Sequence, residues 1–270
     1  MTRPHPESSA PTVRLERRGA VAALLLDRPE ALNAISTAHA RAIGEACAEV
    51  ADDPTVSAVV VASTSPKAFC VGADLKERHG MSTDDLDEQR PVLSAAFRGV
   101  LALPVPTIAA VEGHALGGGF ELALCCDLIV ASQDAGFALP EVGLGLVPGG
   151  GGTQLLTRRV GSNTAADLVF TTRRIDGTEA HRLRIVDRLT GPGGAVTAAT
   201  ELAERIAAQS PVALRQAKIA LRHGADLSIA EGLDVEERAW REAVRSPDRQ
   251  EGIAAFNDKR PPQWPGRLPG

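Results

Sequence analysis

The amino-acid sequence predicts an α/β fold that is followed by a helical C-terminal region. Short apolar runs, several rich in valine, isoleucine and alanine, alternate with segments of helical length in the first part of the chain. Buried parallel strands have this nearly continuous apolar character, and helices connect them. After Ser162 the apolar spacing becomes helical. We therefore expect a largely parallel sheet with right-handed helical crossovers, and not an antiparallel sandwich.

The individual elements follow from apolar periodicity and from residues that start or stop helices. A turn at Arg18-Gly19 separates the first two strands, and Ser36 has the side chain of a helix N-cap. Ser210-Pro211 and residues 224–228 separate the last helices. In chain order we predict strands at 12–17 and 20–27, a helix at 36–53, a strand at 57–63, a helix at 84–103, strands at 107–111 and 128–131, and helices at 198–209, 211–223 and 229–245.

Length and composition predict one main domain. A chain of 270 residues with 44% hydrophobic residues can bury a sizeable core. Residues 1–11 are polar and rich in proline, which predicts a flexible tail. We expect the core over residues 12–195, and an appended helical region over 196–270 that packs on a neighbouring subunit.

Charge and cysteine usage argue against several classes of binding partner and against a zinc site. The net charge of −5 gives no general attraction for nucleic acid, and the apolar run at 20–26 is too short to span a membrane. The cysteines form no Cys-x-x-Cys pair and have no histidine spacing that would complete a zinc site. We expect no nucleic acid, no membrane and no metal, and a cytoplasmic location. The cysteines are Cys47, Cys70, Cys125 and Cys126.

Two isolated carboxylates are the first candidates for chemistry. Glu141 is the only charged side chain between Asp134 and Arg158, and Glu121 lies in a similar apolar, glycine-rich stretch. An ionised carboxylate in apolar surroundings is costly unless it is paired or hydrogen-bonded, so the pair suggests acid and base catalysis. The alternative for each residue is structural, because glutamate is also favoured in the first turn of a helix.

Three glycine-rich segments are candidates for binding a ligand through backbone N–H groups. None ends in Gly-Lys-Ser or Gly-Lys-Thr, so a P-loop is excluded, and none has the spacing of a dinucleotide fingerprint. The chain has no Gly-x-Ser-x-Gly, which excludes the usual serine hydrolase. Glycines do allow a ligand to approach backbone N–H groups, which can then stabilise an oxyanion. These segments are Val71-Gly72-Ala73-Asp74, Gly117-Gly118-Gly119 and residues 149–152.

Residues 105–161 resemble the crotonase (enoyl-CoA hydratase/isomerase) superfamily. They run from Val-Pro-Thr-Ile-Ala-Ala-Val-Glu-Gly-His through Gly-Gly-Gly-Phe-Glu to Arg-Arg-Val-Gly. Three further segments match in the same order: Arg-Pro-Glu-Ala-Leu-Asn-Ala at 28–34, Ala-Phe-Cys-Val-Gly-Ala-Asp-Leu at 68–75 and Phe-Asn-Asp-Lys-Arg at 256–260. The resemblance implies a ββα spiral core with a helical C-terminal region, and a homotrimer or a dimer of trimers.

The resemblance also implies roles for four residues. The backbone N–H groups of Ala73 and Gly118 would form an oxyanion hole for a thioester oxygen. Glu121 would act as a base toward water, and Glu141 would protonate the α-carbon. The implied enzyme is a lyase of fatty acid metabolism, an enoyl-CoA hydratase that forms a 3-hydroxyacyl-CoA and needs no cofactor, since the coenzyme A thioester is the substrate.

The contacts to coenzyme A are implied in the same way. Ala31, Leu32 and Val71 would line the path of the pantetheine and adenine, and Phe256 and Lys259 would reach the nucleotide of a neighbouring subunit. Helix packing for Phe256 and a surface charge for Lys259 remain alternatives. The chain departs from many relatives at Glu30, where they have lysine, and at Val71, where they have alanine.

Other functions stay open from the sequence. The same site could isomerise a double bond, or dehydrate a special thioester as a carnitinyl-CoA dehydratase does. A non-catalytic subunit that binds coenzyme A or serves assembly is a second alternative. Asp74 is expected to cap the local backbone and His114 to pack or form a hydrogen bond. The acyl pocket of this family lies largely in the stretch that corresponds to residues 75–98.

Overall fold

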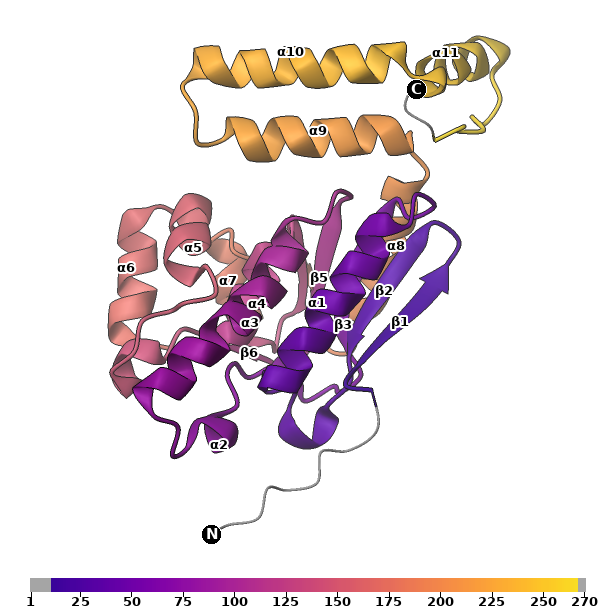
Figure 1. The fold of residues 1–270 in the computed structure, drawn as a ribbon. Helices are drawn as coiled ribbons and strands as arrows, with labels where there is room; N and C mark the ends of the chain where they lie inside the picture. Colours follow the sequence, from indigo (N-terminus) through magenta and orange to yellow (C-terminus); the bar gives the residue numbers. More distant parts are fainter. Residues whose placement is uncertain (1–10, 267–270) are drawn as a thin grey trace.

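The computed structural model describes residues 11–266, and a six-stranded sheet forms its centre (Figure 1). The strand order is β1-β2-β3-β5-β7-β10; the first pair is antiparallel and every later pair is parallel. The predicted α/β class and parallel sheet are confirmed, and the tail predicted at 1–11 lies outside the described residues except for Pro11. The strands are β1 (Val13–Arg18), β2 (Val21–Leu26), β3 (Ala58–Ser63), β5 (Thr107–Val111), β7 (Leu128–Ser132) and β10 (Arg188–Thr190).

A second sheet contains four short strands in the order β4-β6-β8-β9. Its first three strands each follow a strand of the large sheet after a short loop, so the chain repeats the order large-sheet strand, small-sheet strand, helical segment. Sequence periodicity does not reveal these strands, because three residues are too few to display an alternation. They are β4 (Ala68–Cys70), β6 (His114–Leu116), β8 (Gly136–Ala138) and β9 (Ile175–Asp176).

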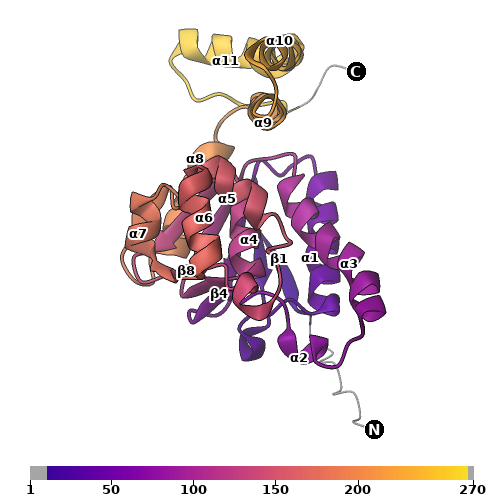
Figure 2. The same ribbon diagram turned by 90° about the vertical axis from the view of Figure 1, so that its left-hand side faces the viewer.

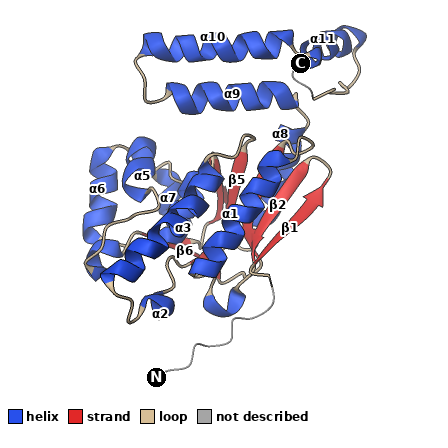
Figure 3. Cartoon of the chain, viewed as in Figure 1, coloured by secondary structure: helices blue, strands red, loops and turns tan. Residues whose placement is uncertain are grey.

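Helices cover both faces of the large sheet, as Figure 3 shows by the strands enclosed between helices. Along β3, Val59 and Val61 belong to the core that contains α1, α3 and α4, while Val60 belongs to a second core with α8. Apolar side chains on both faces explain why β3 reads as a continuous apolar run. The helices are α1 (Thr37–Asp52), α3 (Thr83–Leu101), α4 (Gly118–Cys125) and α8 (Ala195–Ala207).

Shorter helical segments surround the two sheets, and α5 and α6 lie beside α4 (Figure 2). Ser36 is the N-cap of α1, as predicted, since its Oγ accepts a hydrogen bond from the N–H of His39 at 3.2 Å. The remaining segments are η1 (Pro29–Ala31), α2 (Leu75–Arg78), η2 (Glu141–Leu144), α5 (Gly152–Val160), α6 (Ser162–Thr171) and α7 (Gly177–Arg182).

The last three helices extend away from the rest of the molecule in both Figure 1 and Figure 2. Lys218 in the first of these helices forms an ion pair with the core, in which its Nζ lies 2.7 Å from Oδ2 of Asp127. Within residues 11–266 no helix is both long and apolar enough to cross a membrane. The helices are α9 (Pro211–Gly224), α10 (Ile229–Arg245) and α11 (Pro247–Asp258). The first two are confirmed predictions, and α11 lies in the region 196–270 that was predicted to be helical, although no bounds were predicted for it.

Candidate active site

A cavity of about 580 Å³ lies where α2, α3, α4 and η2 meet. Five of the predicted site residues line it: Val71, Ala73, Gly118, Glu121 and Glu141. Residues that are 70 positions apart in the chain therefore share one space, whose volume suits a small-molecule ligand. The rest of the wall is mainly apolar, with leucine, isoleucine, proline and phenylalanine side chains.

Glu121 is almost fully buried, with 3% of its surface exposed. Its Oε1 accepts hydrogen bonds from the N–H groups of Gly150, at 2.7 Å, and Gly152, at 2.8 Å. Larger residues at these positions would crowd the carboxylate, because a Cβ on Gly150 would lie 2.9 Å from Oε2 and a Cβ on Gly152 would lie 3.0 Å from Oε1 of Glu121. Burial raises the pKa of Glu121, and the glycine N–H groups act against that rise. The two glycines therefore hold and orient this carboxylate.

Glu141 has a different environment. It begins the 3-10 segment η2 directly after Pro140, and its Oε2 is buried without a hydrogen-bond partner in the part of the chain that the structure describes. Burial, and then the charge of Glu121, raise the pKa of Glu141 to about 7. At neutral pH a large fraction of Glu141 therefore carries a proton, which it can donate.

The N–H groups of Ala73 and Gly118 lie on adjacent segments. A Cβ on Gly72, where φ is +89°, would be 3.0 Å from the nitrogen of Gly118, so these backbones touch. Gly118 is the first residue of α4, and its N–H has no acceptor within the helix. The N–H of Ile35 donates to the carbonyl of Gly72, and the carbonyl of Ile35 accepts from the N–H of Asp74. The N–H of Ala73, between them, has no acceptor among residues 11–266. Both donors line the cavity and can bind one oxygen.

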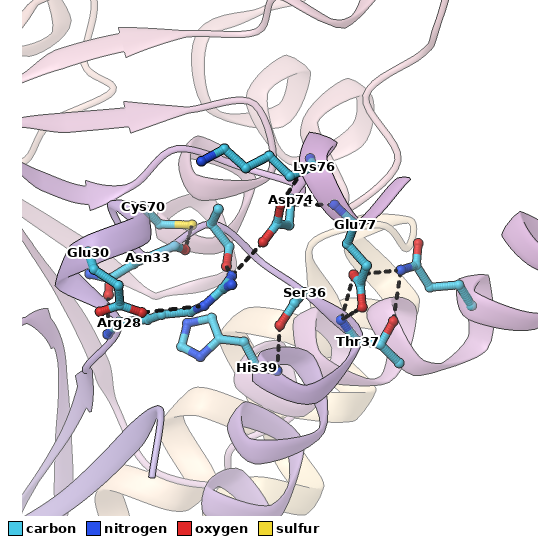
Figure 4. Close-up of polar contacts among 12 residues, drawn as sticks. Arg28, Glu30, Asn33, Ser36, Thr37, His39, Cys70, Asp74, Lys76 and Glu77 are labelled. Carbon is cyan, nitrogen blue, oxygen red and sulfur yellow. Dashed lines mark hydrogen bonds and ion pairs between the residues drawn. The ribbon is translucent and has the colours of Figure 1, made fainter. Parts of the chain in front are cut away.

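A partly buried ion pair fixes the segment that carries Ala73 (Figure 4). Nη1 of Arg28 lies 2.6 Å from Oδ2 of Asp74 and donates to the carbonyl of Ala34 at 2.9 Å. Oδ1 of Asp74 accepts from the N–H groups of Lys76 and Glu77, so its predicted capping role is confirmed. Burial acts to raise the pKa of Asp74, but these hydrogen bonds outweigh it and hold the pKa below its ordinary value. No sequence pattern indicated this role for Arg28.

The other residues assigned to coenzyme A do not line the cavity. Ala31 ends η1, and Leu32 follows it in a left-handed conformation with φ of 52°. Phe256 is 83% exposed on α11, and Lys259 is the exposed C-cap of that helix. Within residues 11–266 none of these four side chains forms part of the cavity wall, so their contacts to coenzyme A stay predictions.

The structure adds charged residues that sequence reasoning missed. Arg78 in α2 and Arg90 in α3 line the cavity, and Arg90 donates to the carbonyl of Gly149. Both lie in the stretch 75–98, where an acyl pocket was expected. In the described part of the chain, no group of three or more histidine, cysteine, aspartate or glutamate side chains is placed to hold a metal ion.

Comparisons with known proteins identify the family of this chain. A family model described as enoyl-CoA hydratase/isomerase matches residues 16–267. The chain is 40% identical to enoyl-CoA hydratase domain-containing protein 2, mitochondrial, of Homo sapiens, over 90% of this chain and 85% of that protein. It is 38% identical to methylglutaconyl-CoA hydratase, mitochondrial, of Homo sapiens, over 93% of this chain and 75% of that protein.

A solved structure gives the same result for the fold. The crystal structure of enoyl-CoA hydratase from Bacillus anthracis matches with a TM-score of 0.93 and 34% identity, over 95% of this chain and all of that chain. The crotonase-type core with a helical C-terminal region, which the resemblance implied, is thereby confirmed.

Proposed function

This chain belongs to the enoyl-CoA hydratase/isomerase family, and on that premise we propose that it adds water to a 2-trans-enoyl-CoA to give a 3-hydroxyacyl-CoA. The observation that carries the proposal is that Glu121 and Glu141 line one cavity together with the N–H groups of Ala73 and Gly118. Isomerisation of a double bond needs one carboxylate to move one proton. Two carboxylates in different environments suit the addition of water, in which one group removes a proton and another supplies one.

The first step of the proposed reaction stabilises negative charge. Attack of water on the β-carbon moves an electron pair through the α-carbon onto the thioester oxygen, which becomes an enolate oxygen. The N–H groups of Ala73 and Gly118 would bind this oxygen more strongly as its charge grows. One such donor contributes about 3 kcal/mol to the transition state in comparable oxyanion holes.

The two glutamates would move the protons. Oε1 of Glu121 is occupied by the N–H groups of Gly150 and Gly152, which leaves Oε2 to accept a proton from the attacking water. Glu141, whose pKa lies at about 7, would give its proton to the α-carbon. Hydroxide has then been added to the β-carbon and a proton to the α-carbon. A proton passed from Glu121 to Glu141 restores the starting state.

An activity screen tests this proposal. Purified protein should remove the enoyl-thioester absorbance of at least some short, medium or branched 2-enoyl-CoAs, and mass spectrometry should find a product heavier by one water. A product of unchanged mass with a shifted double bond would identify an isomerase instead. Turnover of carnitinyl-CoA alone would identify the specialised dehydratase. Binding of acyl-CoA without any turnover would refute the enzyme and favour a non-catalytic subunit.

We also propose how coenzyme A is held and how chains associate. Ala31, Leu32 and Val71 would line the path of the pantetheine and adenine, and Phe256 and Lys259 would contact the nucleotide bound to a neighbouring chain. The exposed apolar residues on α9–α11 support association through this region as a trimer or dimer of trimers. Light scattering coupled to size exclusion tests the assembly. These exposed residues are Leu221, Ile229, Leu233, Trp240, Ile253 and Phe256.

The proposal includes no metal or redox cofactor, since the thioester is itself the substrate. Full turnover of protein that has been dialysed against a chelator would support this point, and loss of turnover would contradict it. We propose a cytoplasmic location, because all four cysteines are buried free thiols.

A further inference from the structure

Two arginines lie on a cavity wall that is otherwise mostly apolar. Arg78 at the end of α2 and Arg90 in α3 both line the cavity that contains Glu121 and Glu141. Leu86 and Leu93 lie on the same wall. An acyl chain made only of hydrocarbon would gain nothing from a guanidinium group there, and the guanidinium loses hydration when such a chain covers it. The charge of Arg90 acts on Glu121, but neither guanidinium has a carboxylate partner within 4.0 Å among residues 11–266, so a ligand can supply one.

The side chain of Arg78 is positioned by hydrogen bonds to a neutral amide, and no carboxylate among residues 11–266 pairs with its guanidinium. Its Nε donates to Oε1 of Gln89 at 3.0 Å. Gln89 is 5% exposed, and its Nε2 donates to Oγ1 of Thr37 at 2.8 Å and to Oε2 of Glu77 at 3.0 Å. A neutral amide thus orients the guanidinium of Arg78, and both terminal nitrogens keep their N–H groups available for a ligand.

Neither guanidinium is paired with a carboxylate within 4.0 Å among residues 11–266. Asp87 also lines the cavity, but it forms no ion pair with either arginine there. Arg90 donates one Nη2–H to the carbonyl of Gly149 and keeps its remaining donors. Burial lowers the pKa of Arg78, the neighbouring charge of Glu77 acts to raise it, and the charge of Arg90 acts to lower it, so the two positive charges are close enough to repel each other. An anion between them would relieve this repulsion.

We propose that Arg78 and Arg90 form a subsite for a carboxylate at the far end of the acyl chain. The preferred substrate would then be a 2-enoyl-CoA whose acyl group is a dicarboxylic acid. A carboxylate accepts two parallel N–H bonds from a guanidinium, which makes arginine a specific partner for it. The inference rests on the proposed hydration, because it places the thioester end of the same acyl chain at Ala73 and Gly118.

The experiment compares two substrates of similar length. Glutaconyl-CoA carries a carboxylate at the end of its acyl chain, and 2-hexenoyl-CoA carries a methyl group. We expect wild-type kcat/KM to be at least tenfold higher for glutaconyl-CoA. Arg78→Gln should reduce this ratio about 10- to 100-fold, the effect of one charged hydrogen bond, and Arg78→Lys should restore part of it. Arg98→Gln is the matched control, because Arg98 is exposed on α3 and does not line the cavity.

Each outcome decides between distinct explanations. Hydration of 2-hexenoyl-CoA without any preference for glutaconyl-CoA overturns the subsite and leaves the proposed function intact. An equal loss of kcat/KM for both substrates in Arg78→Gln would assign the arginine to the phosphates of coenzyme A, which also overturns the subsite. If neither substrate reacts, the broader screen of 2-enoyl-CoAs decides the proposed function, and calorimetric binding of glutaryl-CoA and hexanoyl-CoA decides the subsite. Tighter binding of glutaryl-CoA that Arg78→Gln abolishes supports the subsite, and equal binding refutes it.

Discussion

A methyl group added at Gly152 should disable the base without damaging the fold. Gly152 is the first residue of α5, and its N–H donates to Oε1 of Glu121 at 2.8 Å. A Cβ at this position would lie 3.0 Å from Oε1 and 3.2 Å from Cγ of Glu121, and 3.1 Å from Cβ of Pro148. The backbone of Gly152 is not left-handed, so alanine is compatible with its conformation. Gly152→Ala should therefore displace the carboxylate rather than unfold the helix.

The size of the effect follows from the contacts. Displacement by a few tenths of an ångström weakens one of two hydrogen bonds to a charged oxygen, and a bond of this kind is worth about 1.5–3 kcal/mol. The same energy in the transition state corresponds to a loss of about 10- to 100-fold in kcat. Because the N–H groups lower the pKa of Glu121, weakening one of them should raise that pKa and move the acidic limb of the pH–rate profile to higher pH.

Steady-state kinetics across pH, together with urea denaturation, checks this prediction. Gly44→Ala is the matched control, since Gly44 lies inside α1 and a methyl group there would have no other atom within 4 Å. Alanine at either site should favour its helix by up to about 1 kcal/mol. Wild-type kcat in Gly152→Ala, with Glu121 still hydrogen-bonded as before, would refute the reasoning. A loss of activity that is matched by an equal loss of stability would refute it as well.

Three other perturbations have expected results. Activity should fall as pH rises through about 7, because Glu141 loses its proton there. Glu141→Gln should lower kcat by about 10²- to 10⁴-fold. The affinity for coenzyme A, measured through inhibition by free coenzyme A, should change little. Arg28→Met should lower the free energy of unfolding by about 2–3 kcal/mol in urea titrations, because it leaves Asp74 buried without its partner. His39 is fully buried, and burial, followed by the charge of Arg28, lowers its pKa to about 4. The unfolded chain binds this proton from about pH 6.5 downward, so stability should fall by about 3 kcal/mol between pH 6.5 and 4, and His39→Leu should remove that part of the slope.

The sequence predicted the elements whose signals are local. The helix predicted at 229–245 agrees with α10, because its apolar spacing is regular and Ser228 with Glu231 forms a capping box. In contrast, α4 begins with two glycines, which are poor helix formers, and it is stabilised by packing in the core. The apolar residues of α11 do not gather on one face, so periodicity did not indicate a helix there.

The site was predictable only where its signal lies in the local sequence. Isolated carboxylates in apolar sequence marked Glu121 and Glu141, since the cost of burying charge applies wherever the chain folds. The partners of those carboxylates were not visible. Gly150 and Gly152 contact Glu121 across about 30 residues of chain, and Arg28 reaches Asp74 across 46 residues. No local pattern encodes such contacts, because they arise only when separate segments meet.

The contrast between the two glutamates explains why one fold can supply both a base and an acid. Both are desolvated, and desolvation raises the pKa of both. Two backbone N–H groups oppose it at Glu121, whereas Oε2 of Glu141 has no donor among residues 11–266. The charge on Glu121 further favours the proton on Glu141. The glycine segment 149–152 therefore acts on both residues: its N–H groups stabilise the charge of Glu121, and that charge helps to raise the pKa of Glu141.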